Sequence, residues 1–205
     1  MARVDDYKAA IALAVAKLAG QSFVAIRERT GLACPNADRF QIRFLGRLYG
    51  IDFPGFQFAD LEAPEREIPL QEQVLILHYM LGADPERHPG DMIAYLEIPG
   101  ASFYFESFVK QAINPLKEVF GRNLDAFHQA SQALQGTPID AGDAGYRFQV
   151  FPQIALHYIL WEGDEAFDAE ANILFNESTG DTLSPEDGAW LAGMVVHRLT
   201  ALSRG

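Results

Sequence analysis

The chain has 205 residues, of which 49% are hydrophobic and 21% are charged. This composition excludes a disordered chain, because a chain of this length and apolar content can bury a core without disulfides or metals. Acidic residues outnumber basic ones by 28 to 16, giving a formal net charge of −12. Because nucleic acids and anionic membranes attract clustered positive charge, we expect neither as a partner.

The expected compartment is the cytoplasm. Cys34 is the single cysteine and has no partner for an internal disulfide. Residues 9–19 are apolar but are flanked or interrupted by charged residues, so we expect neither a signal peptide nor a membrane span. The length indicates one domain, residues 1–205.

The first third of the chain predicts two helices and then strands. Apolar residues recur every three or four positions up to Gly20 and again up to Gly31, and after that they alternate with polar ones. These periods are typical of amphipathic helices and of half-buried strands. The expected elements are helices over residues 7–18 and 22–30, strands over 39–45 and 48–53, and an extended piece from 56.

The middle of the chain predicts mainly helices, with an interruption at the Asn114-Pro115 pair. The expected elements are a helix over residues 69–81, a loop over 84–91, a strand over 93–98, and helices over 103–112, 116–120 and 123–134.

The last third predicts strands followed by one long helix. Ser184 precedes Pro185 and two acidic residues, a strong helix-start signal. The expected elements are a loop over residues 136–145, strands over 146–150, 154–161 and 171–175, and a helix over 185–202. The fold class is therefore α+β, a mostly antiparallel mixed sheet with helices packed on it and a helix at each terminus. The loop over 136–145 is the one candidate internal boundary, and we expect no division there.

Five carboxylates crowd the acidic segment, which we define as residues 161–170. They are Glu162, Asp164, Glu165, Asp168 and Glu170. The segment can be a solvated hairpin tip, a contact for a ligand or partner, or a cation site, since hard cations prefer oxygen ligands. Its spacing is not that of an EF-hand loop, so we assign no metal. We expect it to border a cavity.

Three histidines lie within apolar segments: His78, His157 and His197. A buried imidazole can bind a transition metal or serve as a general base, or it can be a core residue whose ring nitrogens are hydrogen-bonded. If the chain is an enzyme, the candidate catalytic residues are His78 or His157, with Asp164 or Glu165 as the partner.

Aromatic residues concentrate just before the middle of the chain. Such a group can line a ligand pocket or fill a core. The candidate ligand-binding residues, with the tryptophan of the acidic segment, are Tyr95, Phe103, Tyr104, Phe105, Phe108 and Trp161.

The C-terminal third resembles an uncharacterised family that is known as a domain of unknown function and occurs mainly in anaerobic bacteria and archaea. The residues that carry the resemblance are Phe151-Pro152, Trp161, residues 163–167, residues 173–178 and residues 183–187. Residues 76–81, Phe120-Gly121 and Gly142-Asp143 fit the same pattern, so the resemblance extends from about residue 40 to the end.

This resemblance implies an accessory role in anaerobic cofactor or one-carbon metabolism. Some relatives carry a cysteine motif for a four-iron cluster, which this chain lacks. Ala166 and Asn176 stand where the family pattern leads us to expect acidic residues.

Two functions remain open. The first is a binding or accessory protein that holds a small-molecule cofactor or a protein partner; the identity of any cofactor is unknown. The second is a small-molecule enzyme of hydrolase or lyase type that uses a histidine and a carboxylate. Because catalytic motifs are lacking while aromatic and acidic residues are abundant, we favour the first.

Overall fold

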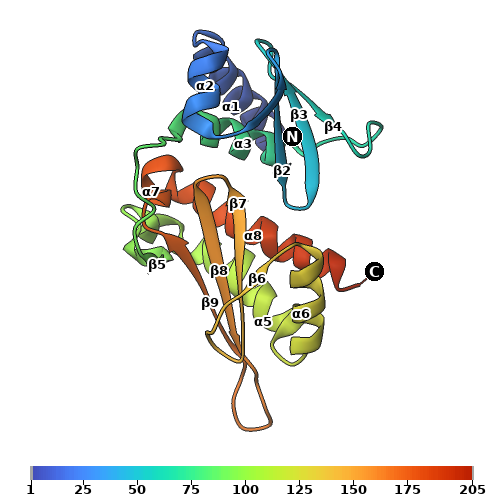
Figure 1. Cartoon of the computed structure of the whole chain (residues 1–205). Helices are drawn as coiled ribbons and strands as arrows, with labels where there is room; N and C mark the ends of the chain where they lie inside the picture. The colour runs from blue at the N-terminus through green and yellow to red at the C-terminus, as the bar shows by residue number, and fades with distance from the viewer. Residues whose placement is uncertain (1, 205) are drawn as a thin grey trace. The chain divides into compact units, whose positions relative to one another are not determined.

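A computed structural model describes residues 2–204 and confirms the α+β class (Figure 1). Helices α1 (Ala2–Ala19) and α8 (Pro185–Leu202) stand at the two ends of the chain, as predicted. The chain forms two compact units. Unit 1 comprises Met1–His88 with Phe151–Gln153, and unit 2 comprises Pro89–Val150 with Ile154–Gly205. The division falls after His88, and the 136–145 segment lies inside unit 2.

Unit 1 combines three helices with a four-stranded antiparallel meander of order β1-β2-β3-β4. After α1 its elements are α2 (Phe23–Thr30), β1 (Ala33–Asn36), β2 (Arg39–Phe44), β3 (Arg47–Asp52), β4 (Gln57–Asp60) and α3 (Leu70–Gly82). The sequence predicted each of these except β1. Strand β1 was missed because it is short and solvent-exposed, so it carries no apolar alternation.

Local chemistry explains the elements of unit 1. The Ser22 hydroxyl accepts a hydrogen bond from the Ala25 amide at the start of α2, and Gly31 ends that helix in the left-handed conformation. In β2 the alternating residues Phe40, Ile42 and Phe44 are buried, as the pattern predicted.

The core of unit 1 includes residues from a distant part of the sequence. Phe151 stacks on Tyr79 with a centroid separation of 4.4 Å and lies 5.1 Å from the ring of Phe44. The Gln153 side chain donates to the Arg29 carbonyl and accepts from the Asp84 amide. These contacts place Phe151–Gln153 in unit 1 although the strands on either side belong to unit 2.

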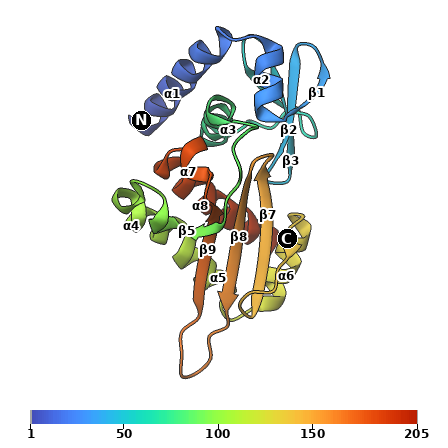
Figure 2. The same ribbon diagram turned by 60° about the vertical axis from the view of Figure 1, so that its left-hand side comes forward.

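Unit 2 has a five-stranded sheet of order β5-β9-β8-β7-β6, with helices against one face (Figures 1 and 2). Its strands are β5 (Met92–Ala94), β6 (Thr137–Pro138), β7 (Ala144–Phe151), β8 (Ile154–Trp161) and β9 (Glu170–Asn176). Its helical elements before α8 are η1 (Tyr95–Glu97), η2 (Ala101–Tyr104), α4 (Phe105–Phe108), η3 (Val109–Ile113), α5 (Asn114–Phe120), α6 (Leu124–Ala133) and α7 (Thr179–Thr182).

The sequence suggested that a helix ends at the Asn114-Pro115 pair, but none ends there. Instead the helix continues from α4 to α5 through the π-helical turn η3. Proline has no amide hydrogen to donate, and widening the turn is one way for a helix to pass it.

The helix-facing side of the sheet is closely packed. On β8, Ile154, Leu156, Tyr158 and Leu160 are fully buried. The Tyr158 hydroxyl donates to the Ala192 carbonyl of α8, and the ring of Phe127 on α6 lies edge-on to Tyr146 on β7. Helix α8 begins with the predicted cap, in which the Ser184 hydroxyl accepts from the Asp187 amide.

The other side of the sheet is more polar. Arg147 and Gln149 of β7 are exposed, and His157 of β8 is half-buried opposite Leu174. We call this side, which carries Arg147, Gln149, His157 and Leu174, the open face. Antiparallel sheets commonly cover one face and leave the other in contact with solvent.

Candidate functional site

The acidic segment connects β8 to β9 and is organised by one of its own carboxylates. Asp164 Oδ1 accepts hydrogen bonds from the amides of Ala166 and Phe167, at 2.7 and 2.8 Å. These amide hydrogen bonds, with Arg122 nearby, hold the pKa of Asp164 below its usual value. Asp164 therefore stabilises the turn, as short polar side chains often do in loops.

The base of the acidic segment is anchored to the end of α5. The Gly163 amide donates to the Gly121 carbonyl at 2.9 Å, and the Arg122 guanidinium donates to the Asp164 carbonyl at 3.1 Å. A side chain on Gly121 would collide with Ala169. On the other side, an Asp143 carboxylate oxygen accepts from the Glu162 amide. The segment is thus a hydrogen-bonded loop with a defined conformation.

The acidic segment exposes aromatic and acidic side chains together. Phe167 is 76% exposed and Trp161 is 42% exposed, and all five carboxylates are exposed. Figures 1 and 2 show the loop extending beyond the sheet and past the ends of α5 and α6. This position gives no support to the expectation that the segment borders a cavity.

The candidate catalytic residues do not form a base–carboxylate pair within unit 2. His157 lies on the open face, where burial and then the charge of Arg147 lower its pKa. In the described part of unit 2, no hydrogen bond joins His157 to Asp164 or Glu165. Glu165 is exposed in the loop, and His197 is exposed on α8.

His78 belongs to unit 1, on α3, and is half-buried. Across residues 2–204, no three side chains of the His, Cys, Asp and Glu types gather as a metal-binding group.

The candidate aromatic residues separate into buried and exposed sets. Tyr95 stacks on Phe108 at 4.3 Å, both approach Phe175 of β9, and the Tyr95 hydroxyl donates to the Pro185 carbonyl. These rings therefore fill the core against the sheet. Phe103 is 89% exposed, while Tyr104 and Phe105 are half-buried. A ligand-binding role for the six residues stays a prediction, and exposure favours Phe103 and Trp161.

A buried amide network follows β9, and nothing in the sequence predicts it except Asn176 itself, which departs from the family pattern. Asn176 Oδ1 accepts from the Ala155 amide at 2.8 Å, and its Nδ2 donates to the Ser178 hydroxyl at 2.6 Å. The Thr179 hydroxyl also donates to Asn176 Oδ1. An amide suits this buried position because it both donates and accepts, whereas an ionised carboxylate only accepts.

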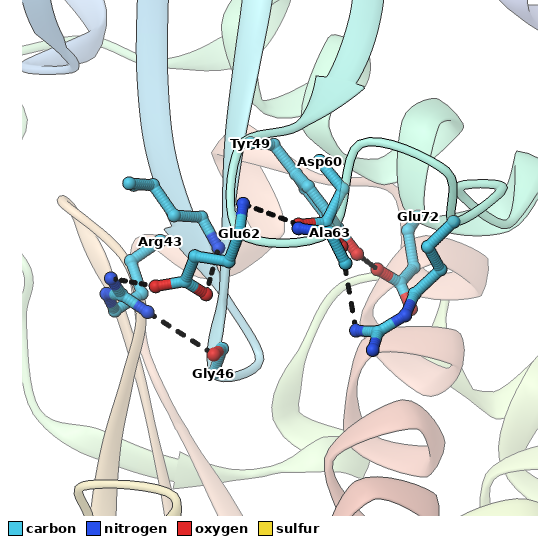
Figure 3. Close-up of polar contacts among 9 residues, drawn as sticks. Arg43, Gly46, Tyr49, Asp60, Glu62, Ala63 and Glu72 are labelled. Atoms are coloured by element: carbon cyan, nitrogen blue, oxygen red, sulfur yellow. Dashed lines mark hydrogen bonds and ion pairs between the residues drawn. The ribbon is translucent and has the colours of Figure 1, made fainter.

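Unit 1 also holds a polar cluster that the sequence did not predict (Figure 3). The Tyr49 hydroxyl of β3 donates to buried Glu72 of α3 at 2.5 Å. Burial and then this carboxylate raise the pKa of Tyr49 to about 12. Asp60, directly opposite Tyr49 on β4, accepts from the amides of Glu62 and Ala63 and forms an ion pair with Arg66.

These contacts link the sheet of unit 1 to α3 and to the 61–66 loop. The hydrogen bonds and the ion pair described here all join residues of unit 1, which indicates a structural role. A sequence pattern does not reveal such a cluster, because its members come from separate elements.

A family model described as "Domain of unknown function (DUF3786)" matches residues 22–198. The chain belongs to this family. The match confirms the resemblance seen in the sequence and begins earlier than residue 40. It includes the acidic segment, the Asn176 network and the unit 1 cluster, and it leaves α1 outside. No curated protein and no solved structure matches the DUF3786 chain.

Among the residues that the structure describes, no single helix is both long and apolar enough to cross a bilayer, although α1 and α2 taken together, with a bend of 111°, meet the criteria of length and composition.

Proposed function

We propose that this DUF3786 protein is a cytoplasmic accessory protein that binds a protein partner through the acidic segment. The observation that carries the proposal is the exposure of Phe167, 76%, on a loop whose backbone is fixed by hydrogen bonds. An ordered, exposed aromatic ring is the kind of residue that anchors protein interfaces, because it buries a large area at a small entropic cost.

The chemistry of the segment supports a partner with a basic and apolar surface. Trp161 and Phe167 supply apolar area, and the surrounding carboxylates supply negative charge. Charge of this kind speeds association and orients the partner, and salt screens it. The setting in anaerobic metabolism comes from the family resemblance and is part of the same proposal.

The experiment is affinity purification from a native extract with the full chain as bait. We expect a protein that is retained by the wild type, is lost with Phe167→Ser, and elutes as salt is raised. Glu165→Gln removes a charge without touching the Asp164 turn. It should therefore reduce the amount of partner that is retained and make retention less sensitive to salt.

The matched control is Val24→Ser on α2, which is 49% exposed and lies in unit 1. It should retain the partner fully. Retention of every captured protein by Phe167→Ser as well as by wild type would overturn the proposal.

The alternative function, a hydrolase or lyase, rests on His157. Because its pKa is lowered, its imidazole is neutral near pH 7, the form that a general base requires. An activity lost in both His157→Ala and Asp164→Asn would favour this alternative. An activity that neither variant affects would exclude these residues as its catalysts.

A further inference from the structure

Helix α1 carries an apolar face that points away from its own unit. Ala14 and Leu18 are buried, on the side that packs against α3. The opposite side presents Ala9, Leu13 and Ala16, all exposed, with Leu13 at 60%. Their spacing of four and three residues places them in one stripe along the helix.

Two opposite charges flank this stripe near its two ends. At about 100° per residue, Asp6 and Lys17 lie about 20° and 40° round the helix from Leu13, on the same side of the stripe. Ala9 and Ala16 lie on the other side of Leu13. The α1 face, as we call Asp6, Ala9, Leu13, Ala16 and Lys17, therefore has a negative end and a positive end.

We propose that the α1 face binds the α1 face of a second copy of this chain, with the two helices antiparallel. When Ala9 of one copy lies opposite Ala16 of the other, the two Leu13 side chains meet near the centre of the interface. The two-fold axis of this pair passes between the helices, perpendicular to both of them and to the line that joins them. It therefore places the charged flanks of the two copies on the same side of the interface. Asp6 of one copy then lies about 3 Å along the axis from Lys17 of the other.

The charges select this occupant and this direction. Antiparallel pairing brings Asp6 and Lys17 of different copies together twice on one flank, whereas parallel pairing sets like charges level across the interface, Asp6 with Asp6 and Lys17 with Lys17, and makes no ion pair. Antiparallel helices also bring opposite ends of their dipoles together. The small side chains of Ala9 and Ala16 let the two backbones approach closely.

One helix face buries less area than a standard interface, so the dimer is weak, with a dissociation constant of about 10–100 μM. The surface is separate from the acidic segment, and it lies outside the residues that the family model matches. The inference is therefore independent of the proposed function.

The test is sedimentation of the full chain over a range of concentrations. We expect a monomer–dimer equilibrium whose dissociation constant rises at least about tenfold with Leu13→Glu. Leu96→Glu, at a site in unit 2 that is 52% exposed, is the matched control and leaves the dimer unchanged. Circular dichroism checks that each variant is folded.

Charge exchange makes the test specific. Asp6→Lys and Lys17→Asp should each weaken the dimer severalfold, and the double variant should restore it. The single variants change exposed side chains, so they remain informative if Leu13→Glu fails to fold. A chain that stays monomeric at about 500 μM, roughly five times the upper end of the expected range, overturns the proposal. So does a dimer that tolerates Leu13→Glu, or a monomer that instead binds anionic lipid vesicles through α1.

Discussion

A single hydroxyl in unit 1 gives a direct test of how the polar cluster contributes to stability. Tyr49→Phe removes the proton that Tyr49 donates to buried Glu72. We expect a loss of about 1–3 kcal/mol in the free energy of unfolding, because a buried carboxylate loses a donor. Denaturant titration measures the loss. Tyr104→Phe, at a half-buried position on η2, is the control, and an equal loss there would contradict the assignment.

His157 offers a prediction about pH. Its pKa is lowered in the folded chain by burial and then by Arg147, so the unfolded chain binds the proton more readily. The folded state is therefore favoured above the unfolded pKa of about 6.5 and loses stability as the pH falls below it.

The measurement is an NMR titration of the imidazole. Arg147→Gln should raise the pKa of His157 while leaving it below the unfolded value, because burial, the larger cause, remains. No change in that variant would show that Arg147 does not act on His157.

At the scale of single residues, the sequence identified residue types better than roles. It placed Asp164 in a turn, but its role as the acceptor for two amides depends on how the loop closes. It grouped Tyr95 with Phe103, yet the first is in the core and the second is 89% exposed. Periodicity cannot separate them, because Tyr95 lies in η1 and Phe103 in η2, two short 3-10 helices that have no regular apolar face.

At the scale of elements, the connection between α5 and the acidic segment depends on the absence of a side chain. Gly121→Val should displace the segment, because the new Cβ would meet Ala169 and the Lys117 carbonyl. The expected result is faster amide exchange at Gly163 and Phe167 with the global unfolding transition little changed. Gly188→Ala, whose Cβ has only ordinary contacts, is the control.

Elements with strong local signals were predicted well. The Ser184 cap gave the start of α8, and the apolar run gave β8 with its correct bounds. The short β1 and α7 were missed, since a few exposed or polar residues carry no period. The helix break expected at Pro115 was wrong, because the backbone passes it through a π-helical turn.

At the scale of the whole molecule, the sequence predicted the fold class but not the two compact units. A division after His88 has no strong composition signal, since the loop there resembles others in the chain. The return of Phe151–Gln153 to unit 1 is a long-range event that a local pattern does not encode. A single domain over residues 1–205 stays a prediction.

A substitution of Phe151 tests how strongly the stability of the chain depends on the contacts that this residue makes in unit 1. Phe151→Ala should lower the free energy of unfolding by about 3–5 kcal/mol, because it removes a buried ring that stacks on Tyr79. Phe103→Ala, at an 89% exposed position, should leave it nearly unchanged. Thermal or denaturant unfolding followed by circular dichroism measures both, and similar effects in the two variants would contradict the prediction.

The discontinuity of unit 1 also bears on how the protein is made. Ribosomes deliver the chain from its amino end, and the first 88 residues emerge well before Phe151 does. Until then Tyr79 lacks its stacking partner, and the Arg29 carbonyl lacks the Gln153 amide. Unit 1 therefore completes its folding only after most of the strands and helices that precede Phe151 in unit 2 have been synthesised. A nascent chain halted before residue 151 should be sensitive to proteases across its α3 region.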